Sequence, residues 1–185
     1  ALEGQFARNA DGGIQVPNLK GSWASASVDV ANLAVTPQGA TGHGHLTFAK
    51  LEDLAPLLGT ALAGAIDLDV ATEPDNAGKV TVALRGDRLR SGAMGVQALK
   101  LDAMVTDPMG AAAADATLKA GGLSGIADLR PASLTVKGDM KAFDATVGVT
   151  GDATNANVTA RIEPSPDEIK VALQKFDGRY QGIPI

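Results

Sequence analysis

Short segments in which aliphatic and polar residues alternate recur along most of this chain, and they constrain its fold more than any other feature. In residues 66–70, for example, Ile, Leu and Val are interleaved with two Asp. Alternation with a period of two predicts β-strands in which every second side chain points to the same face. The chain is therefore predicted to form a sheet with one apolar face and one polar face.

The aliphatic positions of these segments are expected to line the apolar face together. They are Ile66, Leu68, Val70, Val80, Val82, Leu84, Leu99, Leu101, Val105, Leu118, Leu134, Val136, Val147, Val149, Val158, Ile162, Ile169, Val171 and Leu173. The residues between them are mostly Asp, Thr, Lys, Arg, Ala and Gly.

Regular spacing from residue 62 onward predicts an antiparallel meander. The predicted strands cover residues 62–73, 79–90, 96–106, 111–120, 132–140, 142–151, 154–163 and 167–176, and a further strand begins in 178–185. Turn-forming residues separate several of them, at 74–78, 107–110, 121–122, 151–152 and 164–166. Connections this short join antiparallel neighbours, because a parallel crossover needs a dozen or more residues.

The pattern is weaker before residue 62. We predict strands over residues 2–8, 14–16, 23–35 and 45–49. The inward residues of the third change parity after Val30, which predicts a one-residue bulge near Ala31 and Asn32.

One short amphipathic helix is predicted at residues 51–58. Leu51, Leu54, Leu57 and Leu58 follow helical spacing, and Gly59 provides a stop. Pro56 fits only if it lies in the first turn.

The composition predicts a thin, aliphatic interior. Hydrophobic residues make up 45% of the chain, but it has one Trp, one Tyr and four Phe, and aromatic residues usually anchor a core by burying roughly 150–250 Å² each. The apolar face is either the core of an ordinary β-sandwich or barrel, or a groove for lipid tails. The scarcity of large side chains favours the groove. No linker divides residues 1–185, and residues 1–50 are expected to start the same sheet.

Several function classes lack support in the sequence. The net charge is −5 and no basic patch with aromatic residues exists, so nucleic acid is not an expected partner. The absence of Cys excludes disulfides and thiolate metal sites. No nucleophile elbow, Walker loop or Rossmann fingerprint occurs. We therefore predict no catalytic residues, no cofactor and no enzymatic activity.

Two polar motifs are candidates for chemical sites. His43 and His45 are expected on one strand face, but there is no third His, and the nearest acids in the sequence, Glu52 and Asp53, fall in the predicted helix. Asp67 and its neighbour Asp69 also share a face, where Arg85 or Lys100 would pair with them across the sheet. We interpret both motifs as solvated strand residues and predict no metal site.

Several stretches resemble TamB-like proteins of the AsmA-like family of bacterial envelope proteins. They are Leu-Glu-Asp-Leu-Ala-Pro-Leu-Leu-Gly at 51–59, the alternating 62–70, Arg-Gly-Asp-Arg-Leu-Arg at 85–90, the segments 99–103 and 105–107, and the ending 171–184. The resemblance covers most of the chain and is strongest from residue 51 onward.

This resemblance implies an elongated, curled, mostly antiparallel sheet, a β-taco, with an apolar concave interior. It further implies a periplasmic location in a protein anchored in the inner membrane. Phospholipid acyl chains would be the cargo, and an Omp85-family outer-membrane protein (TamA-like) the partner of the full-length protein. No catalytic residues come with the family. Because both ends of the chain begin or stop within a strand pattern, we expect it to be a fragment of a longer repetitive protein.

Two rival functions remain open at this stage. The first is a chaperone-like sheet that holds outer-membrane or autotransporter strands through its edges. The second is a passenger or adhesin sheet with a dry closed core. In either case exposed end strands at 2–8 or 178–185 invite self-association.

Overall fold

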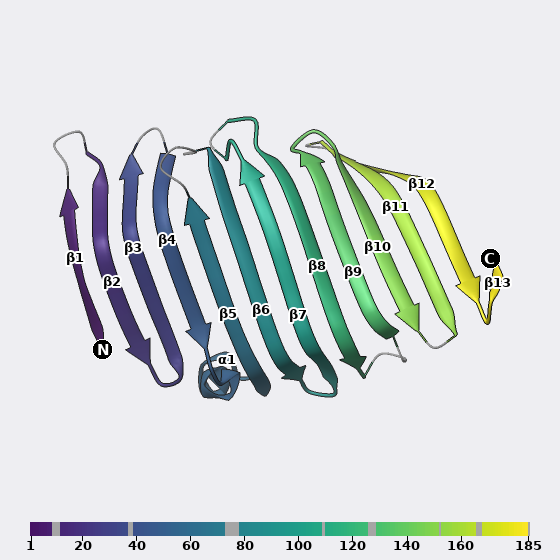
Figure 1. The fold of residues 1–185 in the computed structure, drawn as a ribbon, viewed down its shortest axis with the longest axis horizontal. Helices are drawn as coiled ribbons and strands as arrows, with labels where there is room; N and C mark the ends of the chain where they lie inside the picture. The colour runs from purple at the N-terminus through teal and green to yellow at the C-terminus, as the bar shows by residue number, and fades with distance from the viewer. Residues whose placement is uncertain are drawn as a thin grey trace.

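The chain folds into one open sheet of thirteen strands (Figure 1). The computed structural model describes residues 1–8, 12–36, 39–72, 78–108, 110–125, 129–151, 153–165 and 168–184. Spatial order follows chain order from β1 to β13, so every strand pairs with its neighbour in the sequence. All twelve pairings are antiparallel, as the alternating pattern and short connections predicted.

Most strands are about ten residues long. They are β1 (Leu2–Arg8), β2 (Ile14–Trp23), β3 (Ala26–Thr36), β4 (Gly39–Phe48), β5 (Leu62–Thr72), β6 (Lys79–Ser91), β7 (Met94–Thr106), β8 (Ala113–Ser124), β9 (Leu129–Asp139), β10 (Phe143–Gly151), β11 (Thr154–Pro164), β12 (Ile169–Tyr180) and β13 (Ile183–Pro184). Between β4 and β5 lie a 3₁₀ turn, η1 (Leu51–Leu54), and the helix α1 (Ala55–Leu58). In the described part of the chain, neither helix has the length and hydrophobicity to cross a membrane.

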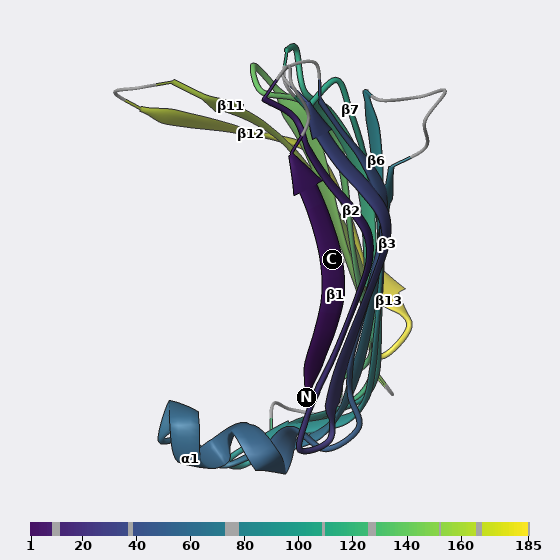
Figure 2. The same ribbon diagram turned by 90° about the vertical axis from the view of Figure 1, so that its left-hand side faces the viewer.

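Seen along its long axis, the sheet is bowed (Figure 2). The helical segment projects from the concave side at one end of the strands, and the β11–β12 hairpin leans toward the same side at the other end. The sheet is nevertheless neither closed nor strongly curled, so the predicted β-taco overstated its curvature. Closure requires the first and last strands to pair, whereas β1 and β13 lie at opposite ends of the strand order.

The fold has almost no dry interior. Within the described ranges Leu51, at 7% exposed, is the single buried hydrophobic residue. A one-layer sheet leaves both faces accessible unless a second layer covers them. The closed sandwich, barrel or passenger core weighed from the sequence is therefore not formed by the described residues.

The bulge and the short helix were predicted correctly. The β3–β4 register shifts between Ala31 and Ala34, and Asn32 adopts a positive φ of 53°. The helical segment occupies residues 51–58 and ends at Gly59, whose φ of 63° is left-handed. Leu57 was expected on the buried side, but it is 70% exposed, because the short helix contacts the sheet mainly through its first turn.

Several predicted boundaries were wrong. The strand predicted at 14–16 runs on to Trp23, and the strand predicted at 45–49 already begins at Gly39. Trp23 ends β2 instead of starting β3, because the chain turns at Ala24 and Ser25. Gly121–Gly122 lies within β8, where the strand continues through a positive φ at Gly122. The last predicted strand, 178–185, is divided, since β12 runs to Tyr180 and only β13 follows. The predicted turns at 74–78, 107–110, 151–152 and 164–166 each include residues outside the described ones.

Candidate functional site

The strand register aligns the aliphatic residues of successive strands into a row across the sheet, which we call the central row. Directly opposed residues in an antiparallel pair have Cβ atoms about 4.5–5.5 Å apart and point to the same face. The central row contains Leu2, Gly21, Val28, Leu46, Leu68, Leu84, Leu101, Leu118, Leu134, Val147, Val158 and Phe176. At about 4.8 Å between strands, it extends roughly 50 Å.

Further rows run parallel to the central row, and together they make up the apolar face. One row contains Val70, Val82, Ala103, Ala116, Val136, Ala145, Ala160 and Leu173; another contains Ile66, Gly86, Leu99, Ala120, Ala132, Val149, Ala156 and Gly178. A fourth contains Thr72, Val80, Val105, Ala114, Gly138, Phe143, Ile162 and Val171. Ile169 pairs with Pro164 at the start of β12. The register thus brings the residues selected by alternation onto one face.

The apolar face is partly open to solvent along its length. Its residues in the middle of the sheet are half-buried by their neighbours, whereas Val147 is 44% exposed. Exposure is high at both ends of the sheet, at Leu2 of β1 (71%) and at Leu173 of β12 (66%). Strand β12 belongs to the hairpin that leans out of the sheet (Figure 2).

A recess of about 560 Å³ lies where the helical segment meets the apolar face. Leu51 and Leu54 close one side of it, over Phe48 and Ile66 of the adjacent strands. Its other hydrophobic lining residues are Leu62, Ala63, Leu89, Met94, Val96 and Leu123. Alternation did not reveal this recess. The helical spacing of Leu51 and Leu54 beside a strand pair was the available signal, because an amphipathic helix must cover some apolar surface.

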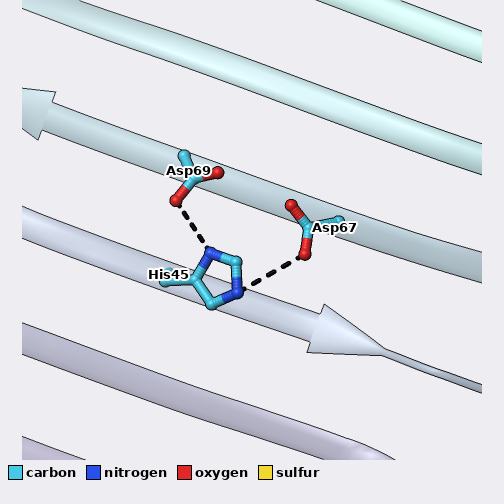
Figure 3. A group of neighbouring side chains, drawn as sticks. All are labelled: His45, Asp67 and Asp69. Carbon is cyan, nitrogen blue, oxygen red and sulfur yellow. Dashed lines mark hydrogen bonds and ion pairs between the residues drawn. The ribbon is translucent and has the colours of Figure 1, made fainter.

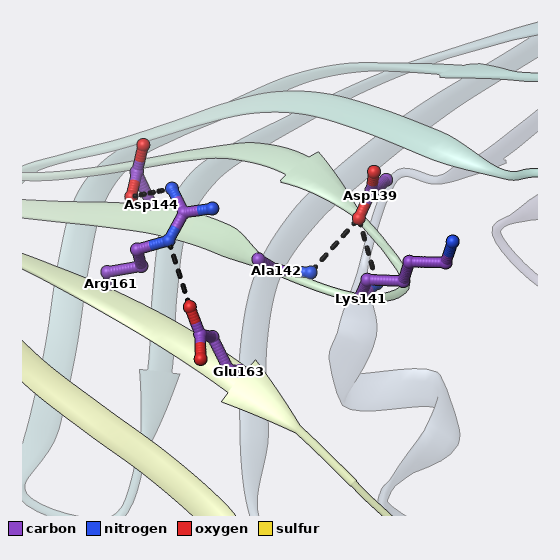
Figure 4. Close-up of polar contacts among 6 residues, drawn as sticks. All are labelled: Asp139, Lys141, Ala142, Asp144, Arg161 and Glu163. Atoms are coloured by element: carbon purple, nitrogen blue, oxygen red, sulfur yellow. Dashed lines mark hydrogen bonds and ion pairs between the residues drawn. The ribbon is translucent and has the colours of Figure 1, made fainter.

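The opposite face carries a ladder of ion pairs. Lys20–Asp29 (2.9 Å), Arg85–Asp102 (3.1 Å), Lys100–Asp102 (2.8 Å) and Lys137–Asp115 (3.5 Å) join neighbours on it. Arg161 bridges Asp144 (3.3 Å) and Glu163 (3.2 Å) (Figure 4). Exposed pairs of this kind contribute about 0–1 kcal/mol each. They keep this face solvated and distinguish it from the apolar face.

The predicted pairing of the β5 carboxylates with basic residues was wrong. Arg85 lies opposite Asp67 in the register, but its guanidinium pairs with Asp102 on the other side. Lys100 also pairs with Asp102. Neither basic residue therefore forms an ion pair with Asp67 or Asp69.

The partners of Asp67 and Asp69 are the two histidines (Figure 3). His45 Nδ1 lies 2.7 Å from Asp69 Oδ1, and its Nε2 lies 3.4 Å from Asp67 Oδ2. His43 Nε2 lies 3.4 Å from the same oxygen of Asp69. Sequence reasoning placed each pair on one face but selected Glu52 and Asp53 as the nearest acids. Asp53 instead accepts a hydrogen bond from the Ser25 backbone N–H at 3.0 Å.

The proximity of these groups shifts two of their pKa values. The pKa of His45 is raised above its ordinary 6.5, first because its ring hydrogen-bonds to Asp69 and then because Asp67 is close. The pKa of Asp69 is lowered below 3.8, chiefly by the same hydrogen bond. Both shifts favour the charged imidazolium–carboxylate pair over the neutral pair.

Comparison with known proteins added no identification. No protein-family model, curated protein or solved structure matches this chain.

Proposed function

We propose that the apolar face is a groove for phospholipid acyl chains in a TamB-like periplasmic bridge between the inner and outer membranes. The observation that carries the proposal is the central row, which crosses twelve strands and contains no charged side chain. The full-length protein would be anchored in the inner membrane. An Omp85-family outer-membrane protein (TamA-like) would receive the lipid at the far end.

The dimensions and chemistry of the face suit an unspecific lipid path. One acyl chain is about 15 Å long, half the ~30 Å hydrocarbon core of a bilayer, so the roughly 50 Å row accommodates several tails in succession. Burial of apolar surface is worth about 25 cal/mol per Å². That is enough to retain a tail without a polar anchor, and the lack of an anchor lets the tail move on.

Site-specific photo-crosslinking tests the groove. Benzoylphenylalanine is placed at Val147 on the apolar face or at Thr150, which is exposed on the opposite face of the same strand. The protein is irradiated with vesicles of phosphatidylethanolamine and phosphatidylglycerol, and adducts are identified by mass spectrometry. We expect phospholipid adducts at position 147 at least several-fold above those at 150. Equal yields, or none at 147, contradict the proposal.

A second candidate is supported by the edge of the sheet. Every residue of β1 is exposed and its outer edge is unpaired, so it presents a template for an incoming strand. Ala1 and Ser22 exchange both backbone hydrogen bonds. The N–H of the next residue, Leu2, therefore points away from β2. In a chaperone-like role, such outward backbone groups of β1 would form hydrogen bonds with a client strand.

Leu2→Pro separates the two functions, with Leu2→Ala as its matched control. Proline removes the outward N–H, and both variants remove the leucine side chain. If the sheet holds client strands by β-augmentation, Leu2→Pro weakens binding of an unfolded outer-membrane β-hairpin peptide and Leu2→Ala does not. If the protein acts only through the apolar groove, the two variants bind this peptide equally.

A further inference from the structure

We propose that His43, His45, Asp67 and Asp69 form a binding site for a divalent transition metal, with Zn²⁺ as the best-suited ion. The site lies on the polar face, opposite the apolar groove, and is independent of lipid binding. It joins two sequence motifs, a His-x-His of β4 and an Asp-x-Asp of β5.

The β4–β5 register builds the cluster. His45 opposes Asp69 directly, and Thr47 opposes Asp67, so one imidazole lies between two carboxylates. His43 opposes Ala71 on one side and Ala31 on the other. These small neighbours leave the His43 ring room to turn toward Asp69.

The carboxylates of this cluster differ from the others on the polar face. Asp29, Asp102, Asp115 and Asp144 each pair with Lys or Arg. Among the ion pairs of the described residues, Asp67 and Asp69 have imidazole partners only. No fixed cation competes for their oxygens, and the imidazole charge is lost when a metal displaces the proton.

The spacing and donor set fit zinc. Two imidazole nitrogens and carboxylate oxygens are a tetrahedral Zn²⁺ donor set with bonds of about 2.0–2.2 Å, which places neighbouring donors about 3.3 Å apart. The His43 Nε2–Asp69 Oδ1 and His45 Nε2–Asp67 Oδ2 distances are both 3.4 Å, so each imidazole already lies at ligand spacing from one carboxylate. One candidate ligand atom from each of His45, Asp67 and Asp69 lies within 4.8 Å of the others. The 2.7 Å contact between His45 and Asp69 would open as the ion enters.

Calorimetric titration of metal-free protein with zinc chloride at neutral pH tests the site. We expect one saturable ion per chain. His45→Ala and Asp69→Asn should each weaken the affinity about tenfold or more, as loss of a ligand or its partner does. Asp115→Asn, which removes a carboxylate from the same face, should leave the affinity unchanged. Far-UV circular dichroism checks that every variant retains the sheet.

Nuclear magnetic resonance of the imidazoles provides a second readout. The chain has two histidines, so both ring signals can be assigned from single variants. One equivalent of Zn²⁺ should shift both sets of signals. Non-saturable binding, wild-type affinity in His45→Ala, or ring signals unmoved at one equivalent would overturn the proposal. None of these outcomes bears on the lipid groove, because the site is on the other face.

Discussion

At the scale of single residues, local hydrogen bonds fix the tight connections between strands. Asp139 ends β9, and its Oδ1 accepts hydrogen bonds from the backbone N–H groups of Lys141 (2.8 Å) and Ala142 (3.0 Å) (Figure 4). Such side-chain-to-backbone bonds define an Asx-type turn. The carboxylate thereby holds β10 in register with β9.

We predict that the pKa of the Asp139 carboxyl lies below its ordinary 3.8, because the N–H groups of Ala142 and then Lys141 stabilise the charged form. A lowered folded-state pKa means that the stabilisation is fully present above the unfolded value. It is lost as the pH falls through the folded value. An NMR titration of the side-chain carboxyl measures this pKa. A value of 3.8 or higher would contradict the prediction.

The histidine cluster shows where residue-level prediction stops. Alternation placed His43 and His45 on one face, and Asp67 and Asp69 on one face, from local sequence alone. It could not pair the two strands, because register is set by partners more than twenty residues away and by the connection between them. Local sequence therefore predicted on which face of the sheet each side chain lies, but not which side chains it contacts across the strands.

At the scale of elements, bulges and one helix give the repetitive sheet its local shape. Gly64 has a φ of 111°, and the β5–β6 register shifts between Ala63 and Ala65. The bulge in β3 was predictable because Val and Leu change parity around it. The second bulge lies in β6, where Arg88 and Leu89 together oppose Gly64. No bulge was predicted there, although Leu84 and Leu89 also differ in parity.

Gly64→Ala is expected to destabilise the protein by about 1–3 kcal/mol, the cost of a strained backbone conformation. An added Cβ would also lie 2.6 Å from the carbonyl oxygen of Arg88. Gly44→Ala is the matched control, because its Cβ meets nothing within 4 Å. Urea unfolding of both variants provides the measurement. Equal midpoints would refute this account of the bulge.

The helical segment should stabilise the sheet through Leu51. Leu51→Ala is expected to lower the free energy of unfolding by about 2 kcal/mol, the low end for a buried leucine. Leu57→Ala, at a side chain 70% exposed, should change it by less than about 0.5 kcal/mol. Thermal unfolding of the two variants tests the difference. An equally large loss at both positions would contradict the packing of Leu51 against the sheet as the source of this stability.

At the scale of the whole molecule, the described residues form no second layer over the apolar face. Sequence alternation predicted the antiparallel meander and the two faces of the sheet. It could not decide between an open sheet and a closed one, because both satisfy the same period of two. The curvature of the sheet depends on twist and bulges accumulated across many strands. It therefore cannot be predicted from the sequence of any one segment.

The native protein is expected to bind an apolar dye such as anilinonaphthalene sulfonate while retaining its native circular dichroism, because the apolar face is accessible before unfolding. Val147→Arg should reduce the fluorescence, whereas Thr150→Arg on the opposite face should not. Dye binding that appears only as the protein unfolds would mean that the face is covered in solution.

The strict neighbour-to-neighbour strand order has a consequence for growth and assembly. Each strand needs only the strand before it, so the chain can fold progressively as it emerges, one hairpin after another, with little loop-closure entropy to overcome. Duplication of one hairpin would lengthen the sheet by roughly 10 Å and leave its cross-section unchanged. Evolution can therefore adjust the span of such a protein in hairpin steps without redesigning its ends.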